Sequence, residues 1–466
     1  MRKDAGVDGD AQRISQLTWL LFLKIFDLKE EDFELMSDEE DDYQSPIPSE
    51  FRWRNWAANS EGITGDALSD FVNNQLFPAL KELKGGEKAQ LIKSVFEDSF
   101  NYMKSGTLLR SVINEVEKSI QFDTQEERHQ FNDIYEKILK DLQSAGNAGE
   151  FYTPRAVTQF IVQMVNPKLG EKVLDPACGT GGFLVDAIEH IKSNEKVDSL
   201  ELRQQLQDTL KGVEKKQLPH MLAVTNLMLH GIDLPKIEHG NWLMESYKKW
   251  SDRDRVEAIV ANPPFGGTEE DGIEKNFPSD FQTRETADLF LWLFMHLLKD
   301  KGRAGIVLPD GSLFGEGMKT RLKEKLLAEC NLHTIVRLPK GVFAPYTSIN
   351  TNLLFFDKGK PTKEIWFYEH PYPEGYKSYN KSKPMRIEEF DPIKAWWKKR
   401  KKTELAWKVS LKEIKARNYN LDFKNPYVEA IDLATPEELL EKYQGLQTEI
   451  ASLRDELKNE LHQSLS

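Results

Sequence analysis

The spacing of apolar residues changes twice along the chain and predicts three regions. Up to about residue 142 the apolar positions recur at helical spacing, and few runs of β-branched residues interrupt them. We therefore expect residues 1–145 to form a helical domain that carries no chemistry of its own. The SAGNAG stretch at 144–149 is typical of a hinge or linker, because glycine and small polar residues end regular structure.

From about residue 150, short apolar runs alternate with longer amphipathic ones, which is typical of a parallel, doubly wound sheet covered by helices. We expect this α/β domain to span residues 146–434. Its candidate strands are Lys172–Leu174, Lys211–Val213, Val256–Ala261, Arg303–Leu308, His333–Leu338 and Asn352–Phe356. Its candidate helices include Pro154–Met164, Gly182–Lys192, Gln217–Leu229 and Ala287–Leu298.

The last region, residues 435–466, begins with signals that start a helix. Thr435 is a good N-cap, Pro436 suits the first helical position and Glu438 completes a capping box. Apolar residues then recur at four-three-four spacing and predict a short coiled-coil seam, made of Leu446, Ile450, Leu453 and Leu457. The helix is either an intramolecular strut or a docking element for helices of a partner, and we favour the partner.

Composition and charge narrow the possible functions. The chain has 466 residues, of which 39% are hydrophobic and 10% aromatic, so it can bury real cores although 30% are charged. Its 76 acidic and 63 basic residues give a net charge of -13, so action on DNA requires local basic patches or a partner. Residues 398–402 form a basic run after two tryptophans, and they are either a phosphate-binding patch or a solvated face.

The sequence also favours a particular compartment. No apolar run approaches the roughly 18 residues of a membrane span, and the first ten residues lack the apolar core of a signal peptide. The two cysteines, Cys178 and Cys330, cannot form a disulfide framework, which favours a reducing cytosol. We expect a cytoplasmic protein with no membrane partner, and we assign no metal site.

The first candidate site is the run Asp-Pro-Ala-Cys-Gly-Thr-Gly-Gly-Phe-Leu at 175–184, which follows a strand and leads into a helix. Its glycines allow positive φ angles and close approach of the backbone to a ligand beyond the strand end. The spacing matches neither the Gly-Lys-Ser/Thr of a phosphate loop nor G-x-G-x-x-G, which predicts a nucleoside without a pyrophosphate. Glu214, which ends the next candidate strand, suits hydrogen bonds to ribose hydroxyls.

The second candidate site is Asn-Pro-Pro-Phe at 262–265, directly after an apolar strand. The prolines fix an extended backbone and remove two N–H donors, while the Asn262 amide offers a donor and an acceptor. A flat ligand with an exocyclic amine, such as adenine, would donate to Asn262 and a backbone carbonyl, and stack on Phe265. The amine nitrogen then gains lone-pair character and can attack an electrophilic methyl group. The acidic loop at 268–284 is either a mobile flap over this site or an ordinary surface loop.

These residues together resemble the amino-methyltransferases that use S-adenosylmethionine. The glycine-rich run resembles their cofactor loop, residues 262–265 their motif for methylating an exocyclic nitrogen, and residues 150–155 an additional cofactor-binding motif. The resemblance narrows to the modification subunit of type I restriction-modification systems, a DNA adenine-N6 methyltransferase family. Further segments that resemble this family are Gln16–Lys24, Leu222–Gly231, Leu338–Phe343 and Thr351–Asp357.

The resemblance implies an α/β fold: a Rossmann-like methyltransferase domain with a mixed, mostly parallel seven-stranded sheet, a helical N-terminal domain and a C-terminal helix. It implies adenine-specific methylation of DNA, with a flipped-out base at Asn262, Pro263, Pro264 and Phe265. The cofactor contacts that it implies are Glu150, Phe151, Tyr152, Thr153, Pro154, Arg155, Asp175, Gly179, Thr180, Gly181, Gly182, Glu214 and Asn241. Asn241 stands where the family often has an acidic residue near the cofactor's adenine.

The resemblance also implies partners, namely DNA, a specificity subunit that chooses the target sequence, and a second copy of the chain. Whether a restriction nuclease subunit joins them is open. About a hundred residues follow the last candidate strand, and none of their segments resembles a large DNA-reading domain. Two other hypotheses remain open from the sequence: a methyltransferase acting on an RNA or protein amine or amide, and a non-catalytic scaffold.

Overall fold

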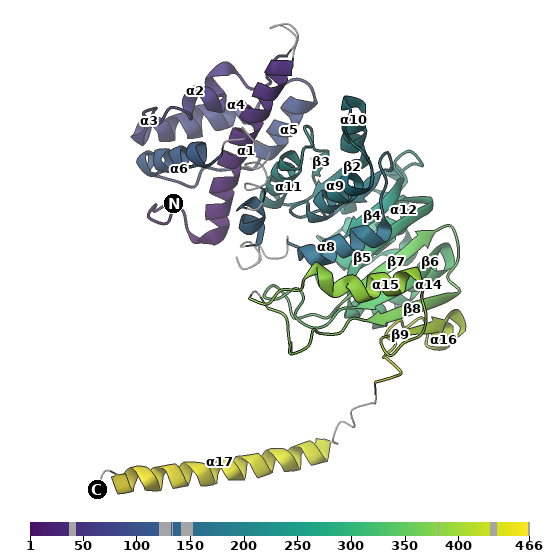
Figure 1. The fold of residues 1–466 in the computed structure, drawn as a ribbon. Coiled ribbons are helices and arrows are strands. Elements are labelled where there is room, and N and C mark those ends of the chain that lie inside the picture. The colour runs from purple at the N-terminus through teal and green to yellow at the C-terminus, as the bar shows by residue number, and fades with distance from the viewer. Residues whose placement is uncertain are drawn as a thin grey trace. The chain divides into compact units, whose positions relative to one another are not determined.

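The computed structural model describes residues 1–36, 43–120, 132, 134–140, 152–380, 382–428 and 436–464. The expected hinge at 144–149, the candidate residues Glu150 and Phe151, and the Thr435 N-cap lie outside these described residues. So do the expected domain boundaries at 145 and 434, and the division into three domains stays a prediction. The chain divides into two compact units, residues 1–423 and residues 424–466, and each is described by itself (Figure 1).

The first unit begins with a layer of helices, as the helical spacing predicts (Figure 1). Helix α1 (Gly9–Met36) buries one wide apolar face that includes Trp19 and Phe22. Phe77 packs edge-on against Trp19, with ring centroids 5.1 Å apart, and joins α1 to the rest of the layer. The other helices are α2 (Trp53–Trp56), α3 (Gly65–Asp70), the π-helical turn Phe71–Leu76, α4 (Phe77–Lys81), α5 (Glu87–Phe96) and α6 (Gly106–Ser119).

This helical layer packs directly on the α/β part of the unit through α11 (Gln217–Leu229). The Tyr135 hydroxyl donates to the carbonyl of Leu222 over 3.0 Å, and the Gln217 amide donates to the carbonyl of Val95. Because α11 contacts these helices on one side and strands of the sheet on the other, it is apolar and buried along most of its length.

The described residues form one mixed sheet of nine strands, in the order β3-β2-β1-β4-β5-β7-β6-β8-β9. Five neighbouring pairs are parallel, while β7 runs antiparallel to β5 and β6, and β9 runs antiparallel to β8. The strands are β1 (Val173–Asp175), β2 (Leu210–Glu214), β3 (Ile237–His239), β4 (Val256–Ala261), β5 (Leu298–Pro309), β6 (Cys330–Arg337), β7 (Thr351–Lys358), β8 (Glu364–Glu369) and β9 (Ala406–Ser410).

The sheet is mixed and mostly parallel, as predicted, but the expected number of seven strands is wrong. β8 and β9 lengthen it at one edge, in a region where several prolines predict irregular structure. Both strands form because their apolar residues complete a core: Ile365 and Phe367 are fully buried, and Trp407 stacks on Phe367 with ring centroids 5.5 Å apart. Tertiary burial therefore overrides the local signal of the prolines.

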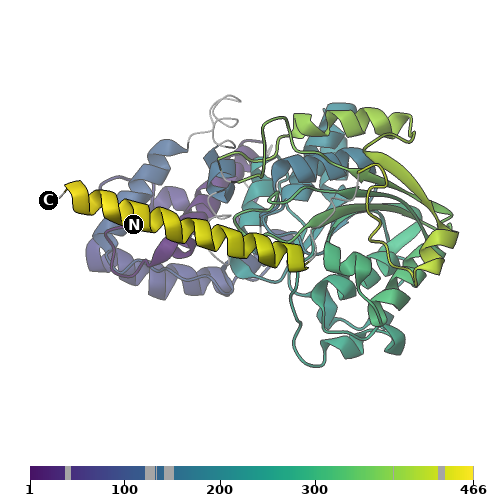
Figure 2. The same ribbon diagram turned by 90° about the horizontal axis from the view of Figure 1, so that it is seen from below.

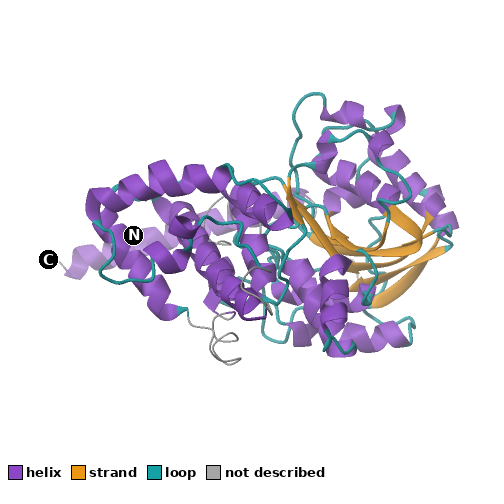
Figure 3. Cartoon of the chain, turned by 90° about the horizontal axis from the view of Figure 1, so that it is seen from above, coloured by secondary structure: helices purple, strands orange, loops and turns teal. Residues whose placement is uncertain are grey.

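Two cores lie on the two faces of the sheet, because alternate residues of each strand point to opposite sides. In β4, Val260 belongs to the core beneath α8 (Arg155–Val165), α9 (Gly182–Asn194) and α11, whereas Ile259 belongs to the other. Figure 3 shows the orange strands between these two helical layers. The remaining helices of the unit are α10 (Leu200–Thr209), α12 (Thr286–Leu297), α13 (Asp310–Phe314), α14 (Met318–Glu329), α15 (Asp391–Lys398) and α16 (Leu411–Ala416).

The second unit contains the predicted C-terminal helix, α17 (Pro436–Ser464), which is continuous over 29 residues (Figure 2). The four apolar residues of the predicted seam are each between 51% and 62% exposed. Within the described part of the chain, no helix has the length and apolar character that crossing a membrane requires.

Candidate active site

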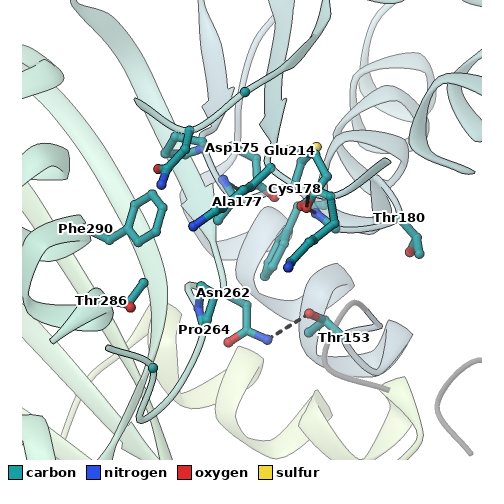
Figure 4. Close-up of a pocket in the computed structure, with 18 of the residues that line it drawn as sticks. Thr153, Asp175, Ala177, Cys178, Thr180, Glu214, Asn262, Pro264, Thr286 and Phe290 are labelled. Carbon is teal, nitrogen blue, oxygen red and sulfur yellow. Dashed lines mark hydrogen bonds between the residues drawn. The ribbon is translucent and has the colours of Figure 1, made fainter. Parts of the chain in front are cut away.

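A pocket of about 310 Å³ lies at the carboxyl ends of the first four strands, where ligands bind in open α/β sheets. Because those strands are neighbours, the residues that follow them converge from four different places in the sequence. Figure 4 shows Asn262 and Pro264 on one side of the pocket, and Asp175, Ala177 and Glu214 on another. The predicted residues that line it are Thr153, Asp175, Gly179, Thr180, Gly182, Glu214, Asn241, Asn262 and Pro264.

The glycine-rich corner after β1 is shaped by two of its glycines. Gly179 and Gly181 have φ angles of 53° and 78°, the left-handed region that favours glycine. A Cβ on Gly181 would lie 3.0 Å from a methyl of Leu227 and 3.3 Å from the Cβ of Ala223, both on α11. Gly181 therefore does not line the pocket, but it lets the loop pack against α11 while its neighbours Thr180 and Gly182 line the pocket.

The Glu214 carboxylate holds this corner in place. It accepts hydrogen bonds from the backbone N–H of Gly179 over 3.0 Å and of Lys216 over 2.7 Å, and it is 6% exposed. One carboxylate at the end of β2 thus fixes the loop after β1 and lines the pocket, while its contact with a ribose stays a prediction.

Asp175, the last residue of β1, is fully buried and accepts from the N–H of Ala177 over 3.2 Å. Burial raises the pKa of this carboxyl well above its usual range, and the nearby Glu214 raises it further. Its second oxygen is buried and has no hydrogen-bond partner in the part of the chain that the structure describes.

At the second corner, only one of the two polar atoms of the Asn262 amide has a hydrogen-bond partner among the described residues. The Asn262 Nδ2 donates to the Thr153 hydroxyl over 2.9 Å, while the Asn262 Oδ1 is buried without a hydrogen-bond partner among the described residues (Figure 4). Pro264 is exposed and lines the pocket, whereas Pro263 is buried beneath it. Phe265 does not line the pocket and packs edge-on against Phe343, with ring centroids 5.8 Å apart.

The described residues of the 150–155 segment form hydrogen bonds with both corners. The Arg155 guanidinium donates to the carbonyl of Gly182 over 2.9 Å and lies 3.2 Å from the Asp186 carboxylate on α9. Burial raises the pKa of Asp186 to about 7, although Arg155 acts in the opposite direction. The Tyr152 hydroxyl donates to Glu136, so Tyr152, Pro154 and Arg155 lie behind the pocket rather than in its lining.

Several residues that line the pocket have no sequence pattern that marks them as site residues. Phe290 has helical apolar spacing and is indistinguishable from a core residue, yet its ring points into the pocket beside Thr286 (Figure 4). Glu269 is one acid among several in a loop, so no sequence signal separates it from its neighbours. Lys215 follows the predicted Glu214, and that adjacency is the one signal that could have suggested it.

The loop at 268–284 is closed at its base and anchored in the core. Thr268 pairs with Glu285 in an antiparallel bridge, and the N–H of Glu269 donates to the carbonyl of Arg284 over 2.8 Å. Ile273 and Phe277 are 6% and 3% exposed, so the loop has a packed interior. It lines the pocket through residues 267–270.

The basic run at 398–402 lies near the opposite edge of the sheet. The Arg400 guanidinium is 4.5 Å from the ring centroid of Trp397 and lies within hydrogen-bonding distance of His333, near the start of β6. Because β5 and β6 both run antiparallel to β7, the start of β6 is at the amino ends of the parallel strands. The run therefore does not line the pocket, and a role in phosphate binding stays a prediction.

Two family models match the chain. The N-6 DNA Methylase model matches residues 126–434, which is more than half of the chain, and the HsdM N-terminal domain model matches residues 1–116. The first family implies S-adenosylmethionine as the cosubstrate. The match to DNA methylases favours DNA over the RNA or protein amine that the sequence leaves open.

Similar proteins agree with this assignment. The chain is 59% identical over its full length to the methylase subunit of the type I restriction enzyme EcoEI from Escherichia coli, and the match covers 96% of that relative. A modification subunit of a type I restriction enzyme from Vibrio vulnificus YJ016 has the same fold, with a TM-score of 0.82, 45% identity, and coverage of 92% of this chain and 94% of that one.

A second solved chain comes from a structure of complex assembly and conformational transition in the type I restriction-modification system. Its TM-score is 0.82, its identity 38%, and the match covers 99% of this chain and 96% of that one. Together with the glycine-rich corner and the Asn-Pro-Pro-Phe corner in one pocket, these findings settle the family. The chain belongs to the N-6 DNA methylases, as the adenine-N6 methylase (modification) subunit of a type I restriction-modification system.

Proposed function

We propose that the pocket binds S-adenosylmethionine along the glycine-rich corner and that Asn262 and Pro264 receive an adenine of DNA, whose N6 amine takes the methyl group. One observation carries this proposal: inside the pocket, Asn262 presents a buried amide oxygen that has no partner in the part of the chain that the structure describes. A buried acceptor without a partner costs free energy, and an exocyclic amine supplies the missing donor. The proposal therefore assigns Asn262 to the substrate and the neighbouring corner to the cofactor.

The order of the strand ends supports the placement of the cofactor. Asn241 follows β3, Glu214 ends β2 and the glycine-rich loop follows β1. Because these strands are neighbours, the three form a row that ends beside Asn262, directly after β4. S-adenosylmethionine supplies an electrophilic methyl group. Glu214 suits its ribose hydroxyls, and the residues between Gly179 and Gly182 give the rest of the molecule a close backbone surface.

The Asn262 corner then acts on the adenine amine. Thr153 accepts from Nδ2 and thereby turns Oδ1 towards the amine, which donates to Oδ1 and to a backbone carbonyl of the corner. These two acceptors draw the amine out of conjugation with the ring, so that its lone pair could attack the methyl group that the bound cofactor would supply. The methyl–sulfur bond would break, and the methylated amine would lose one proton to solvent. A base inside a duplex cannot reach such a pocket, so we propose that the adenine is flipped out of the helix.

The first experiment is single-molecule sequencing of host DNA for N6-methyladenine, comparing the wild type with Asn262→Ala. We expect methylation at one defined, two-part motif in the wild type and its loss in the variant. Calorimetry with S-adenosylmethionine should show affinities that agree within about threefold, since Asn262 is assigned to the base. Asn74→Ala, at an exposed position in the N-terminal helices, is the matched control and should methylate normally.

Two outcomes would contradict the proposal. Methylation that persists in Asn262→Ala would remove the amide from the reaction. Loss of cofactor binding in the same variant would show that the two corners are not separate sites.

We further propose that a separate specificity subunit selects the target sequence and binds α17. The helix exposes its whole apolar seam, and the net charge of -13 does not suit unaided DNA binding. A second copy of the chain, and in some assemblies a nuclease subunit, would join the same complex. Mass photometry of the two purified subunits tests this: Leu453→Asp should abolish the complex, whereas Gln447→Glu, on the same helix, should preserve it.

A further inference from the structure

Glu269 is a buried carboxylate that lines the pocket and that no sequence pattern singles out. It is 8% exposed and lies in the loop that follows the Asn262 corner. Its backbone is fixed, because its N–H donates to the carbonyl of Arg284 and its carbonyl accepts from the Arg284 guanidinium over 3.0 and 3.1 Å. Its neighbour Glu270 is exposed, so burial here is specific to one of two adjacent acids.

Three elements converge on this carboxylate. The Thr286 hydroxyl, at the start of α12, donates to Oε1 over 3.0 Å. The Asn241 amide, after β3, donates to Oε2 over 3.2 Å, and the Lys215 ammonium, after β2, lies 3.4 Å from the same oxygen. These contacts hold the carboxylate rigidly, and a rigidly held charge discriminates between ligands more sharply than a mobile one.

The position of Glu269 along the pocket indicates which part of a ligand it meets. With the ribose at Glu214 and the methyl group near Asn262, the base of the cofactor extends towards the end of β3. Asn241 lies at that end and carries no charge, but it holds Glu269 beside it. A carboxylate accepts hydrogen bonds and donates none, so it favours a base edge that carries an amine and disfavours one that carries an oxygen.

We propose that Glu269 selects the cofactor by the exocyclic amine of its adenine ring, and that Asn241, Lys215 and Thr286 position the carboxylate for this contact. This inference rests on the proposed function, because it assumes that the pocket binds S-adenosylmethionine. It adds a specificity residue from a loop that sequence analysis leaves as either a flap or a surface segment.

The test compares two ligands, S-adenosylhomocysteine and its 6-oxo analogue S-inosylhomocysteine, by calorimetry on the full chain. We expect the wild type to prefer the amino ligand by about 100-fold or more, because a buried acceptor rejects an oxygen in place of a donor. In Glu269→Gln the preference should fall below about tenfold, since the amide can present its own N–H to the oxo group. Asp280→Asn, which changes an exposed acid of the same loop outside the pocket lining, is the matched control and should keep the wild-type preference.

The ratio of the two affinities is the informative quantity, because a purely structural role of Glu269 would weaken both ligands equally. Partial unfolding of a variant lowers the number of binding sites but leaves this ratio unchanged. Glu269→Asp is a second variant: it keeps the charge, withdraws it by one methylene, and should reduce the preference by about tenfold.

Failure of this inference and failure of the proposed cofactor site give different results. If Glu269→Gln keeps the wild-type ratio, or if the wild type binds both ligands equally, the inference is overturned and the proposed cofactor site stands. If the wild type binds neither ligand, the proposed cofactor site fails as well.

Discussion

The two corners of the pocket differ in how completely the protein satisfies its own polar groups. At the glycine-rich corner, Glu214 accepts from two backbone N–H groups and Arg155 donates to the carbonyl of Gly182. At the other corner, Asn262 has one partner, Thr153, and leaves a buried oxygen unpaired among the described residues. The glycine-rich loop is thus held in place before any ligand arrives, although the buried second oxygen of Asp175 beside it also has no partner among the described residues. The Asn262 amide, in contrast, has one hydrogen bond, and its oxygen is open to a donor.

This difference suits the two ligands that we propose. A cofactor is the same molecule in every cycle, so a rigid, preformed surface loses little conformational entropy when the cofactor binds. A target base arrives only after extrusion from DNA, and a site that gains its missing hydrogen bond from that base recognises its amine. Substitutions at the first corner should therefore alter stability and cofactor affinity, and those at the second should alter turnover.

The largest effect is expected from Arg155→Met, which would break the support behind the first corner. The change leaves the buried Asp186 without its cation. At pH 8, where this carboxyl is ionised, removing one partner of a buried pair costs about 3–5 kcal/mol. The urea midpoint should fall accordingly, measured by circular dichroism. Arg203→Met removes an exposed arginine from α10 and should leave the midpoint unchanged. An unchanged midpoint in Arg155→Met would show that the pair contributes nothing to stability.

The stability of the same variant should also depend on pH differently from that of the wild type. Burial already raises the pKa of Asp186 from 3.8 to about 7, so its folded state keeps a proton that the unfolded state loses. A raised carboxyl pKa makes stability fall as pH increases through that range. Without Arg155 the pKa of Asp186 rises further, so the variant should lose stability between pH 6 and 8 more steeply than the wild type. Equal slopes would contradict this assignment.

The second prediction concerns Glu214→Gln. A glutamine amide has one oxygen, so it cannot accept from both Gly179 and Lys216 in the way the carboxylate does. One buried N–H then faces the amide nitrogen, which costs about 1–3 kcal/mol, or roughly 5- to 160-fold in affinity for S-adenosylmethionine. Calorimetry measures this, with Glu201→Gln on α10 as the exposed control. Methylation at saturating cofactor should be largely restored, and a lasting loss would place Glu214 in the chemical step.

The same contrast explains what the sequence could predict. The two corners are local motifs, each directly after an apolar strand, so Asp175, Glu214 and Asn262 could be located from short patterns. The six strands proposed all form, because their apolar runs are long enough to be recognised, whereas the three-residue β3 is not among them. The family resemblance, confirmed by the comparisons, depended on the same short motifs.

What the sequence could not predict depends on residues that are distant along the chain. β8 and β9 are stabilised by the pair Phe367 and Trp407, which no local window contains. Arg155 bonds Gly182 and Asp186 on α9 and does not line the pocket, so its contact with the cofactor stays a prediction. Glu269 gains its importance only from Asn241, Lys215 and Thr286, which lie on three separate elements.

The third prediction compares alanine substitutions at two adjacent glycines of the first corner. Gly181 has a φ angle of 78° and a crowded Cβ position, whereas the nearest atom to a Cβ on Gly182 would be 3.8 Å away. Gly181→Ala should therefore cost about 1–2 kcal/mol in stability and weaken cofactor binding, because an L-residue resists the left-handed region. Gly182→Ala should fold normally. Equal unfolding temperatures for the two variants in differential scanning fluorimetry would show that α11 does not constrain the loop.

The smallest effect is expected at the second corner, from Thr153→Val. The substitution preserves shape but removes the hydroxyl that accepts from Asn262, so the amide keeps its oxygen but loses the contact that orients it. The loss of one hydrogen bond corresponds to about 0.5–1.5 kcal/mol, or a roughly 2- to 12-fold fall in kcat for DNA methylation. Thr153→Ser restores the hydroxyl and should recover most of kcat. Affinity for S-adenosylmethionine should stay within about twofold of the wild type in both variants, because Glu214 and the glycine-rich loop hold the first corner independently. A matching loss of cofactor affinity in Thr153→Val would mean that the two corners form one coupled site. The contrast between a loop held by several hydrogen bonds and an amide held by one would then no longer describe this pocket.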